Sequence, residues 1–329
     1  MNTYFFTEGS RELGFGHLTR CLALSQALHK IGLESFFFIN GDDSFKNLFS
    51  KQNYQLIDWG NNLNKCFDKK KNLVIVDSYL ASMKIYDQIV SQSQISVAID
   101  DNCRLNYPIN CLINGSVYAK ILPYQPSRQI RFLGPEYILL REDFLKEKPN
   151  KLSSEIKNIL ITFGGDDVRH LTLPLLKRLH LNFPKIIKTV ILGSGFDNKN
   201  EIIRQQNEYI KIIDNPSIST LIKKMKQADC AISAGGQTLN ELAFLGIPTI
   251  AIKVADNQHN NVSYWSAKGY TINAGNYNNE NLFDIVIKAI KKLSSLSERK
   301  KRQLMGLKLC DGQGSNRVAR QLLQILENT

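Results

Sequence analysis

The residues of this chain best suited to chemistry lie in glycine-rich turns that follow short apolar runs. The first such turn is Gly14-Phe15-Gly16-His17, which comes soon after the apolar residues 4–6. Glycines let backbone approach a ligand closely, and the free N–H groups that open the next helix favour an anion. At this helix start the imidazole of His17 is expected to stay neutral and basic, which suits a general base. A surface or capping histidine without a chemical role is the alternative.

The second turn has the same strand-to-helix pattern and reads Ser233-Ala234-Gly235-Gly236-Gln237-Thr238-Leu239-Asn240-Glu241. Its glycines and the helix that starts near Thr238 offer N–H groups to a diphosphate. Glu241 lies one helical turn further on, where a carboxylate can accept hydrogen bonds from two ribose hydroxyls. A capping box between Thr238 and Glu241 is the alternative, and it needs no ligand.

A third turn, Gly164-Gly165-Asp166-Asp167, also follows an apolar run. Three such turns, spread over both halves of the chain, predict a phosphate-bearing ligand in a cleft between two domains. The dinucleotide pattern Gly-x-Gly-x-x-Gly fails in the first turn because Thr19 occupies the third glycine position. No Gly-Lys-Ser/Thr follows, so a P-loop is excluded as well.

Acidic and cysteine residues give no sign of a metal site. The doublets Asp42-Asp43 and Asp100-Asp101 lack a nearby histidine, and turn chemistry accounts for them. The six cysteines are scattered, without a Cys-x-x-Cys pair or a Cys/His cluster at zinc spacing. We therefore expect reduced thiols, no metal and no cofactor.

The turns are positioned by apolar runs that alternate with amphipathic stretches. Runs at 73–77, 95–100, 111–114, 159–163, 190–192 and 230–234 are typical of parallel strands covered on both faces. A polar, Lys-rich break at 146–154 interrupts this alternation. The sequence therefore predicts an α/β protein with two doubly wound, Rossmann-like domains facing a cleft, the first at 1–148 and the second at 149–329.

Composition restricts where such a protein acts and what it binds. With 329 residues, 43% of them hydrophobic and 22% charged, the chain offers no run apolar enough to span a membrane. The first residues lack the features of a secretory signal, so we expect a cytoplasmic protein. The net charge is +12, and residues 288–329 hold ten Lys/Arg against three Asp/Glu. These basic residues alternate with Leu and Ile and lack aromatic neighbours, which favours a solvated helix face over a nucleic-acid or membrane surface.

Several motifs together resemble the UDP-sugar hydrolases of pseudaminic acid biosynthesis, and the likeness covers most of the chain. They are Gly14-Phe15-Gly16-His17 with Arg20, Asp77-Ser78-Tyr79, residues 133–137 through Arg141-Glu142, Phe163-Gly164-Gly165-Asp166 and Asn240-Glu241. The second glycine turn and Gly246-Ile247-Pro248 are also similar to MurG-type glycosyltransferases.

The resemblance implies a GT-B fold and metal-independent hydrolysis of UDP-2,4-diacetamido-2,4,6-trideoxy-β-L-altropyranose to the free sugar and UDP. It gives the sugar and the catalytic residues to the first domain and UDP to the second. His17 would activate water, and Tyr79 and Asn257 would assist at the sugar. Arg141 would bind substrate, and Glu241 the uridine ribose. With the glycine turns, the substrate-binding set is Gly14, Gly16, Arg20, Arg141, Gly164, Gly165, Ser233, Gly235, Gly236, Thr238, Asn240, Glu241 and Gln258.

Two other functions use the same residues. An inverting glycosyltransferase would place an acceptor hydroxyl where the hydrolase has water, and Asn257-Gln258-His259-Asn260-Asn261 resembles the donor-sugar loop of such enzymes. A subunit that only holds a nucleotide sugar for a catalytic partner would need the second turn but not His17. The expected binding partner is thus a small UDP-sugar, without nucleic acid or membrane insertion, and the sequence leaves the oligomeric state open.

Overall fold

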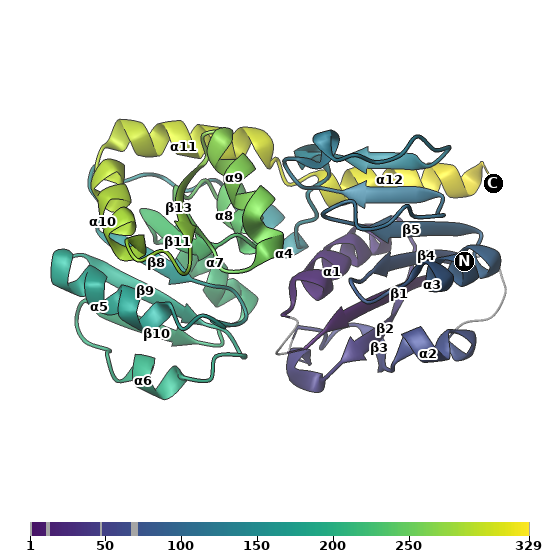
Figure 1. The fold of residues 1–329 in the computed structure, drawn as a ribbon, viewed down its shortest axis with the longest axis horizontal. Helices are drawn as coiled ribbons and strands as arrows, with labels where there is room; N and C mark the ends of the chain where they lie inside the picture. Colours follow the sequence, from purple (N-terminus) through teal and green to yellow (C-terminus); the bar gives the residue numbers. More distant parts are fainter. Residues whose placement is uncertain (1, 11–13, 47, 67–71, 329) are drawn as a thin grey trace. The chain divides into compact units, whose positions relative to one another are not determined.

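The computed structural model describes residues 2–10, 14–46, 48–66 and 72–328 of the chain (Figure 1). The chain divides into two compact units, one made of Met1–Glu142 with Gly312–Thr329 and the other of Asp143–Asp311. Each unit contains one parallel sheet, and the predicted α/β architecture with two doubly wound domains is confirmed.

The first unit has a seven-stranded sheet in the order β3-β2-β1-β4-β5-β6-β7, in which all neighbouring strands are parallel. Its elements are β1 (Asn2–Gly9), α1 (Gly16–His29), β2 (Ser35–Gly41), η1 (Asp43–Phe45), β3 (Asn53–Leu56), α2 (Trp59–Asn62), η2 (Leu63–Lys65), β4 (Asn72–Asp77), α3 (Met83–Gln92), β5 (Ile95–Ile99), β6 (Cys111–Asn114), η3 (Ala119–Ile121), β7 (Ile130–Leu133), η4 (Pro135–Tyr137) and α12 (Gly314–Glu327).

Both faces of this sheet are buried, as the continuous apolar runs predicted. Successive side chains of a strand point to opposite faces, so Phe5 and Phe6 of β1 enter different cores. Phe5 packs with residues of α1 and α12. Phe6 packs on the other face, where Trp59 and Tyr86 lie. The sheet is therefore the middle layer of three.

The second unit has a six-stranded parallel sheet in the order β10-β9-β8-β11-β12-β13. After α4 (Glu142–Leu145) its elements are β8 (Asn158–Thr162), α5 (Thr172–Asn182), β9 (Ile187–Leu192), α6 (Lys199–Ile203), β10 (Ile210–Asp214), α7 (Ile218–Lys226), β11 (Cys230–Ala234), α8 (Thr238–Phe244), β12 (Thr249–Lys253), η5 (Asp256–Gln258), α9 (His259–Ala267), β13 (Thr271–Asn276), α10 (Leu282–Leu293) and α11 (Leu296–Leu309). One face of the sheet packs against α5 and α10 through residues such as Leu175, Leu179 and Ile290.

The order of strands reverses beside the first strand of each sheet. In the first unit β2 and β3 extend from one side of β1, and β4 to β7 from the other. In the second unit β9 and β10 flank β8 on one side, and β11 to β13 on the other. Loops that leave two such neighbouring strands diverge, and open α/β sheets bind ligands at the resulting switch point. The structure therefore has two such points, at β1/β4 and at β8/β11.

The predicted division at 148/149 assigned all of the C-terminal residues to the second domain. In the structure residues 312–329 belong to the first unit instead. Helix α12 contributes Val318, Ala319 and Leu322 to the core beside α1. Its start is fixed by Arg317, whose Nη1 donates to the carbonyl of Glu136 over 2.8 Å. The amphipathic pattern of α12 shows that it has a buried face, but it does not say which unit the helix covers.

The basic C-terminal region is only partly a solvated face. Arg299 is fully buried, and its guanidinium donates to the carbonyl groups of Leu293, Ser153 and Ser154. It therefore fastens the start of the second unit to α11. In the described part of the chain no helix combines the length and the apolar character that crossing a membrane requires.

Candidate active site

A histidine and an aspartate meet at the β1/β4 switch point of the first unit. His17 follows β1 as the second residue of α1, and Asp77 is the last residue of β4. Nδ1 of His17 lies 2.6 Å from Oδ1 of Asp77, and both side chains are buried. A carboxylate at Nδ1 fixes the tautomer with the proton on that nitrogen, which leaves the lone pair of Nε2 to accept another proton. The arrangement has the orientation that a general base needs.

Arg20 lies one helical turn after His17 and balances the charge of Asp77. Its Nε and Nη2 donate to the two carboxylate oxygens of Asp77 over 2.5 and 2.6 Å, and its Nη1 donates to Asp101 over 2.5 Å. Burial disfavours the charged form of Asp77, yet Arg20 and His17 outweigh it and hold the pKa of that carboxyl well below its ordinary value. All three of these hydrogen bonds go to Asp77 and Asp101. They support a role for Arg20 in positioning the two carboxylates rather than in binding the substrate directly.

Tyr79 closes the other side of His17. The His17 and Tyr79 rings pack edge to face with their centroids 4.5 Å apart. The Tyr79 hydroxyl donates to Oδ2 of Asp101 over 2.6 Å. Burial and the charge of Asp101 raise the pKa of Tyr79 well above its ordinary value, so the hydroxyl remains a donor. Asp101 thus links Tyr79 to Arg20.

Sequence reasoning missed Asp101, because the doublet Asp100-Asp101 was interpreted as turn chemistry. Only Asp100 has that role. It is buried and accepts hydrogen bonds from the Tyr107 hydroxyl and the backbone N–H of Cys103, each over 2.7 Å. The doublet follows β5, next to β4 in the sheet, and that position was the available signal.

Sequence reasoning also missed Glu8, which lies near the carboxyl end of β1 and is fully buried. One carboxylate oxygen, Oε1, accepts the backbone N–H of Tyr79 over 2.6 Å, and Oε2 accepts the hydroxyl of Ser78. Oε1 also lies 4.0 Å from Nε2 of His17, on the side opposite Asp77. A charged residue near the end of an otherwise apolar strand was the signal that could have found it.

The glycines of the first turn face open space. Gly14 has a φ of 75°, in the left-handed region that favours glycine, and its N–H donates to the carbonyl of Ser10 over 2.9 Å. A Cβ atom on Gly14 or on Gly16 would meet no atom of the described residues within 4 Å. The backbone conformation accounts for a glycine at position 14, and Gly16 leaves room in which a ligand could approach the backbone.

Arg141 lies between η4 and α4 and is partly buried. The backbone N–H of the next residue, Glu142, donates to Oε1 of Gln26 over 2.9 Å. Gln26 belongs to the C-terminal half of α1, whereas His17 lies at its N-terminal end. Arg141 therefore stays a predicted binding residue outside the group around His17.

In the second unit, two predicted glycine turns meet at the β8/β11 switch point. Gly164 follows β8 with a φ of 90°, and a Cβ atom on it would lie 3.8 Å from Oγ1 of Thr238, the first residue of α8. The carbonyl of Gly165 accepts the N–H of Gly195 over 2.9 Å. A Cβ atom on Gly236 would have no described atom within 4 Å. Backbone from both turns thus borders the same region.

The turn after β8 does not open a helix that could receive an anion. Helix α5 begins at Thr172, and the carboxylate of Asp167 accepts the N–H groups of Leu171 and Thr172 over 3.0 and 2.6 Å. The chain thus supplies its own anion at this helix start. Asp167 is a capping residue, and only the glycine backbone remains for a ligand.

The predicted roles of Gly235 and Gln258 need correction. The N–H of Gly235, which was expected to face a phosphate, donates to Oε1 of Gln258 over 3.0 Å. The same Oε1 accepts the N–H of Val254 over 3.2 Å, and the Gly235 carbonyl accepts Nδ2 of Asn261 over 2.7 Å. Gln258 therefore holds the glycine turn against the next loop, because its amide oxygen is occupied by backbone.

Glu241 is buried in the first turn of α8. The capping box predicted as its alternative role is not formed, because Gln237 is the N-cap and Thr238 already belongs to the helix. Asn240 donates its side-chain amide to Oε1 of Gln237 over 3.0 Å, which orders the start of the helix. Ser233 is fully buried at the end of β11, and its Oγ has no hydrogen-bond partner among the residues that the structure describes.

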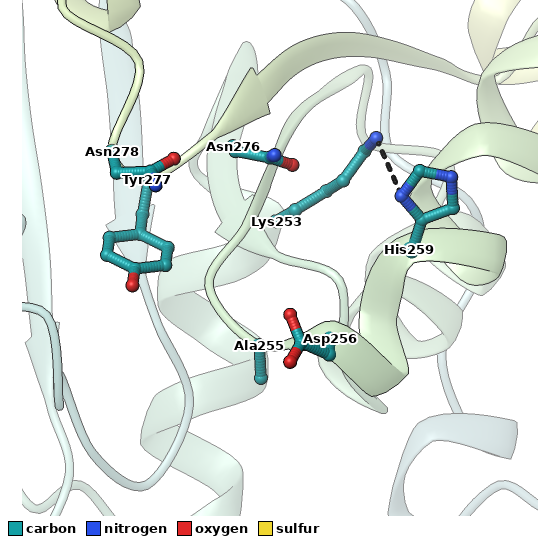
Figure 2. A pocket seen from close by; sticks show the side chains of 7 residues that line it. All are labelled: Lys253, Ala255, Asp256, His259, Asn276, Tyr277 and Asn278. Carbon is teal, nitrogen blue, oxygen red and sulfur yellow. Dashed lines mark hydrogen bonds between the residues drawn. The ribbon is translucent and has the colours of Figure 1, made fainter.

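Asn257 is exposed in η5, and Asp256 before it and His259 two residues after it border a pocket of about 340 Å³ (Figure 2). The pocket lies beyond the carboxyl ends of β12 and β13, and its lining is largely polar. In Figure 2, Nζ of Lys253 faces Nδ1 of His259, and the two atoms are 3.3 Å apart. The lining residues are Lys253, Ala255, Asp256, His259, Asn276, Tyr277 and Asn278.

The described residues include no group of three or more His, Cys, Asp or Glu side chains placed to hold a metal ion. The six cysteines are free thiols, and burial raises the pKa of Cys66 and of Cys111 to about 11. Two carboxylates of the cluster, Asp77 and Asp101, are bridged by the Arg20 guanidinium. That guanidinium is the cation of the cluster.

Comparisons with known proteins agree with this architecture. Residues 158–312 match the glycosyltransferase family 28 C-terminal domain. The crystal structure of Acinetobacter baumannii MurG superimposes with a TM-score of 0.64 over 98% of this chain and 100% of that one, at 13% identity. The predicted GT-B fold is thereby confirmed.

Two curated relatives are more similar in sequence. An uncharacterized protein of Methanocaldococcus jannaschii is 28% identical over 77% of this chain, which spans 55% of that protein's length. A Campylobacter jejuni protein named UDP-2,4-diacetamido-2,4,6-trideoxy-beta-L-altropyranose hydrolase is 25% identical over 83% of this chain and 98% of its own length. The chain therefore has the GT-B fold, its residues 158–312 resemble the glycosyltransferase family 28 C-terminal domain, and most of its length is similar to that hydrolase.

Proposed function

We propose that this chain is a UDP-sugar hydrolase that releases UDP and the free sugar without a metal ion. The proposed substrate is UDP-2,4-diacetamido-2,4,6-trideoxy-β-L-altropyranose, the compound in the name of the Campylobacter jejuni relative. The free sugar would then serve pseudaminic acid biosynthesis. The proposal gives the sugar and the chemistry to the first unit and UDP to the second.

In the proposed reaction, Nε2 of His17 takes a proton from water as the water oxygen attacks the anomeric carbon. The bond between that carbon and the β-phosphate oxygen breaks, and its electron pair leaves with UDP. Attack from the face opposite UDP inverts the anomeric configuration. UDP is a good leaving group, so the reaction needs charge stabilisation at the diphosphate rather than a second, protonating carboxylic acid.

UDP would bind at the β8/β11 switch point. The backbone of Gly164 and Gly236 supports this role, because a Cβ atom on Gly236 would meet no described atom within 4 Å and one on Gly164 would meet only Thr238, at 3.8 Å. Glu241, buried one turn into α8, would accept the ribose hydroxyls. Gln258 would act indirectly by holding Gly235, and the remaining predicted residues Ser233, Thr238 and Asn240 would shape the same turn.

In the first unit Tyr79 would bind the sugar, and Asn257 stays a predicted assisting residue in its own loop of the second unit. The polar pocket beside that loop suits hydroxyl and acetamido groups, since its Lys253, Asn276 and Asn278 side chains offer hydrogen-bond donors and acceptors.

One observation favours hydrolysis over mere nucleotide-sugar binding, and it is the buried 2.6 Å contact between His17 and Asp77. A binding subunit needs no oriented imidazole. Arg20 and Asp101 hold the pair further, and such multiple support is typical of a residue that must keep one orientation during a reaction.

The test is to incubate the purified chain with the proposed substrate in H₂¹⁸O, without any acceptor alcohol. Release of UDP with ¹⁸O in the free sugar, first as the inverted anomer, is the expected result. Label in UDP would mean attack at phosphorus and would refute the mechanism. Release of UDP only after an acceptor is added would identify a glycosyltransferase instead, and the His17→Ala protein serves as the control for background hydrolysis.

A further inference from the structure

We propose that one face of α11 is a docking surface for an anionic lipid bilayer. The face consists of Lys300, Lys301, Leu304 and Lys308, and we call it the lysine face. Binding there would be peripheral and reversible, without a segment that crosses the membrane. The proposal goes beyond hydrolysis and does not depend on it, because all of these residues lie on a helix that the proposed reaction does not use.

Buried contacts fix which side of α11 faces the protein. Arg299 and Arg302 are both buried, and Nη1 of Arg302 donates to the carbonyl of Thr271 over 2.7 Å. A Cβ atom on Gly306 would lie 2.8 Å from the ring of Tyr270, so the helix packs closely against the unit at this point. These contacts fasten one side of α11 and hold the opposite side toward solvent.

The opposite side carries the lysine face. Its residues follow one another at intervals of three or four positions around Leu304, which places them together on one side of the helix. All of them are exposed, and Leu304 has 66% of its surface accessible. The ammonium groups of Lys300, Lys301 and Lys308 therefore surround an outward-facing apolar side chain.

Acidic residues do little to balance this charge. Glu298 is the acidic residue of α11, and its carboxylate already accepts Nη2 of Arg302 over 2.6 Å. Nζ of Lys292, in the last turn of α10, lies 3.6 Å from the same carboxylate. Lys291 and Lys292 are exposed, and α10 directly precedes α11 on the outside of the second unit (Figure 1). The positive surface thus continues from the lysine face onto the end of α10.

The structure divides the basic residues that the sequence grouped as one solvated face. Arg299 and Arg302 belong to the interior, where they bind backbone carbonyls. The remaining cations of α11 are lysines on one side, and the leucine among them is exposed instead of buried. Alternation of Lys and Leu along the chain does not show which leucines are buried, so the sequence did not reveal the lysine face.

The chemistry of the lysine face fits a bilayer better than a nucleic acid. Each lysine near an anionic leaflet adds attraction to the headgroups, and an exposed leucine is removed from water when it enters the headgroup region. Nucleic-acid surfaces use aromatic rings that stack on bases and guanidinium groups that bind phosphate in pairs. Helix α11, which the structure describes in full, has no aromatic residue, and both of its arginines are buried.

The experiment is co-sedimentation of the full-length chain with lipid vesicles. Vesicles of phosphatidylcholine and phosphatidylglycerol in equal parts should bind the protein at about 0.1 M NaCl and release it at about 1 M, where the Debye length falls to about 3 Å. Vesicles of phosphatidylcholine alone should bind little. The double variant Lys300→Glu, Lys301→Glu should weaken binding to the mixed vesicles by at least about tenfold. Leu304→Ser should weaken it by about fivefold.

Matched controls come from α5 and the turn after it. The double variant Lys177→Glu, Lys185→Glu changes the net charge by the same amount, again at exposed lysines. Leu181→Ser removes a leucine that is 74% exposed. Both controls should bind the mixed vesicles as the unmodified protein does. Thermal unfolding of each variant verifies that the fold is retained, which is expected because every substituted side chain is exposed.

Failure of the unmodified protein to bind the mixed vesicles would overturn the proposal. An equal loss of binding in the α5 controls would overturn it as well, because net charge would then explain the effect. Binding of polyuridylic acid that the α11 variants abolish, without binding of vesicles, would identify a nucleic-acid surface instead. The sedimentation requires neither substrate nor turnover, so its outcome is independent of whether the protein hydrolyses a UDP-sugar.

Discussion

Nδ1 of His17 and Oδ1 of Asp77 lie 2.6 Å apart, although 60 positions separate the two residues in the chain. The contact exists because β1 and β4 are neighbours in a parallel sheet, so that their carboxyl ends share one edge. At this edge of the sheet Nδ1 of His17 is hydrogen-bonded to Asp77, and Nε2 is the ring nitrogen that does not contact Asp77.

Replacing His17 by alanine should lower kcat by about 10²- to 10⁴-fold, because a general base is lost. UDP affinity should hardly change, since the proposed UDP site lies in the other unit. Steady-state kinetics with the UDP-sugar and calorimetric titration with UDP measure the two quantities. His29→Ala, at the exposed end of the same helix, is the control and should keep its activity. Wild-type turnover of His17→Ala would leave His17 without a chemical role.

The Asp77→Asn substitution should destabilise the protein by about 3 kcal/mol near neutral pH, because Arg20 loses a buried partner. The pKa of Asp77 is lowered in the folded state, so its contribution to stability is fully present above the unfolded-state pKa of about 3.9. It is lost as the pH falls below that value toward the folded-state pKa. Urea unfolding at pH 6 and at pH 3.5 should therefore give a smaller difference between the two proteins at the lower pH.

The surface pair of Asp284 and Arg178 provides the matched control for that measurement. Its hydrogen bond also lowers the pKa of Asp284, but both side chains are exposed and water screens their interaction. Asp284→Asn should change the stability little at either pH. An equally large effect in both variants would contradict the buried role of Asp77.

Saturating UDP should raise the melting temperature of the protein, and Glu241→Ala should abolish the rise. Ligand at about 100-fold excess over Kd stabilises the folded state by about 2.7 kcal/mol, which thermal unfolding detects readily. Glu201 is the control, because it is also an acidic residue in the first turn of a helix in the second unit but is exposed. Glu201→Ala should keep the full shift. The ribose role of Glu241 would fail if its alanine variant kept the shift as well.

Activity should persist after exhaustive treatment with EDTA, because the glycine turns and Glu241 are proposed to bind UDP without a bridging cation. The measurement is the rate of UDP release before and after chelation, with a metal-dependent nucleotide-sugar enzyme in parallel to prove that chelation is complete. If EDTA abolished UDP release and only Mg²⁺ or Mn²⁺ restored it, the proposed metal-independent mechanism would be wrong.

Much of this arrangement was predictable because it depends on local sequence. Apolar runs such as 73–77 specify buried strands whatever their neighbours are, and glycines after a strand specify a tight turn. The turns at Gly14, Gly164 and Gly235 therefore lie where they were expected, each after a strand of a parallel sheet. His17 was recognisable for the same reason, since it directly follows the turn that contains Gly14 and Gly16.

Other features depend on which segments become neighbours, and the sequence carries no local signal for that. Asp101 contacts Arg20 and Tyr79 only because β5 lies next to β4 in the sheet. The N–H of Gly235 donates to Gln258 because the loop after β12 folds back on the turn after β11. Helix α12 has an amphipathic pattern that suits either unit, and its packing on α1 is decided by the shape of the core.

The sequence by itself determined the two sheets, the turns at their strand ends and the presence of an imidazole at one of them. Only the tertiary structure decided which carboxylates surround that imidazole. Strand order and register set the distance between Glu8, Asp77 and His17, and burial removes the water that would otherwise screen their charges. Electrostatic interaction depends on distance and solvent exposure, and neither is a property of a residue's place in the chain.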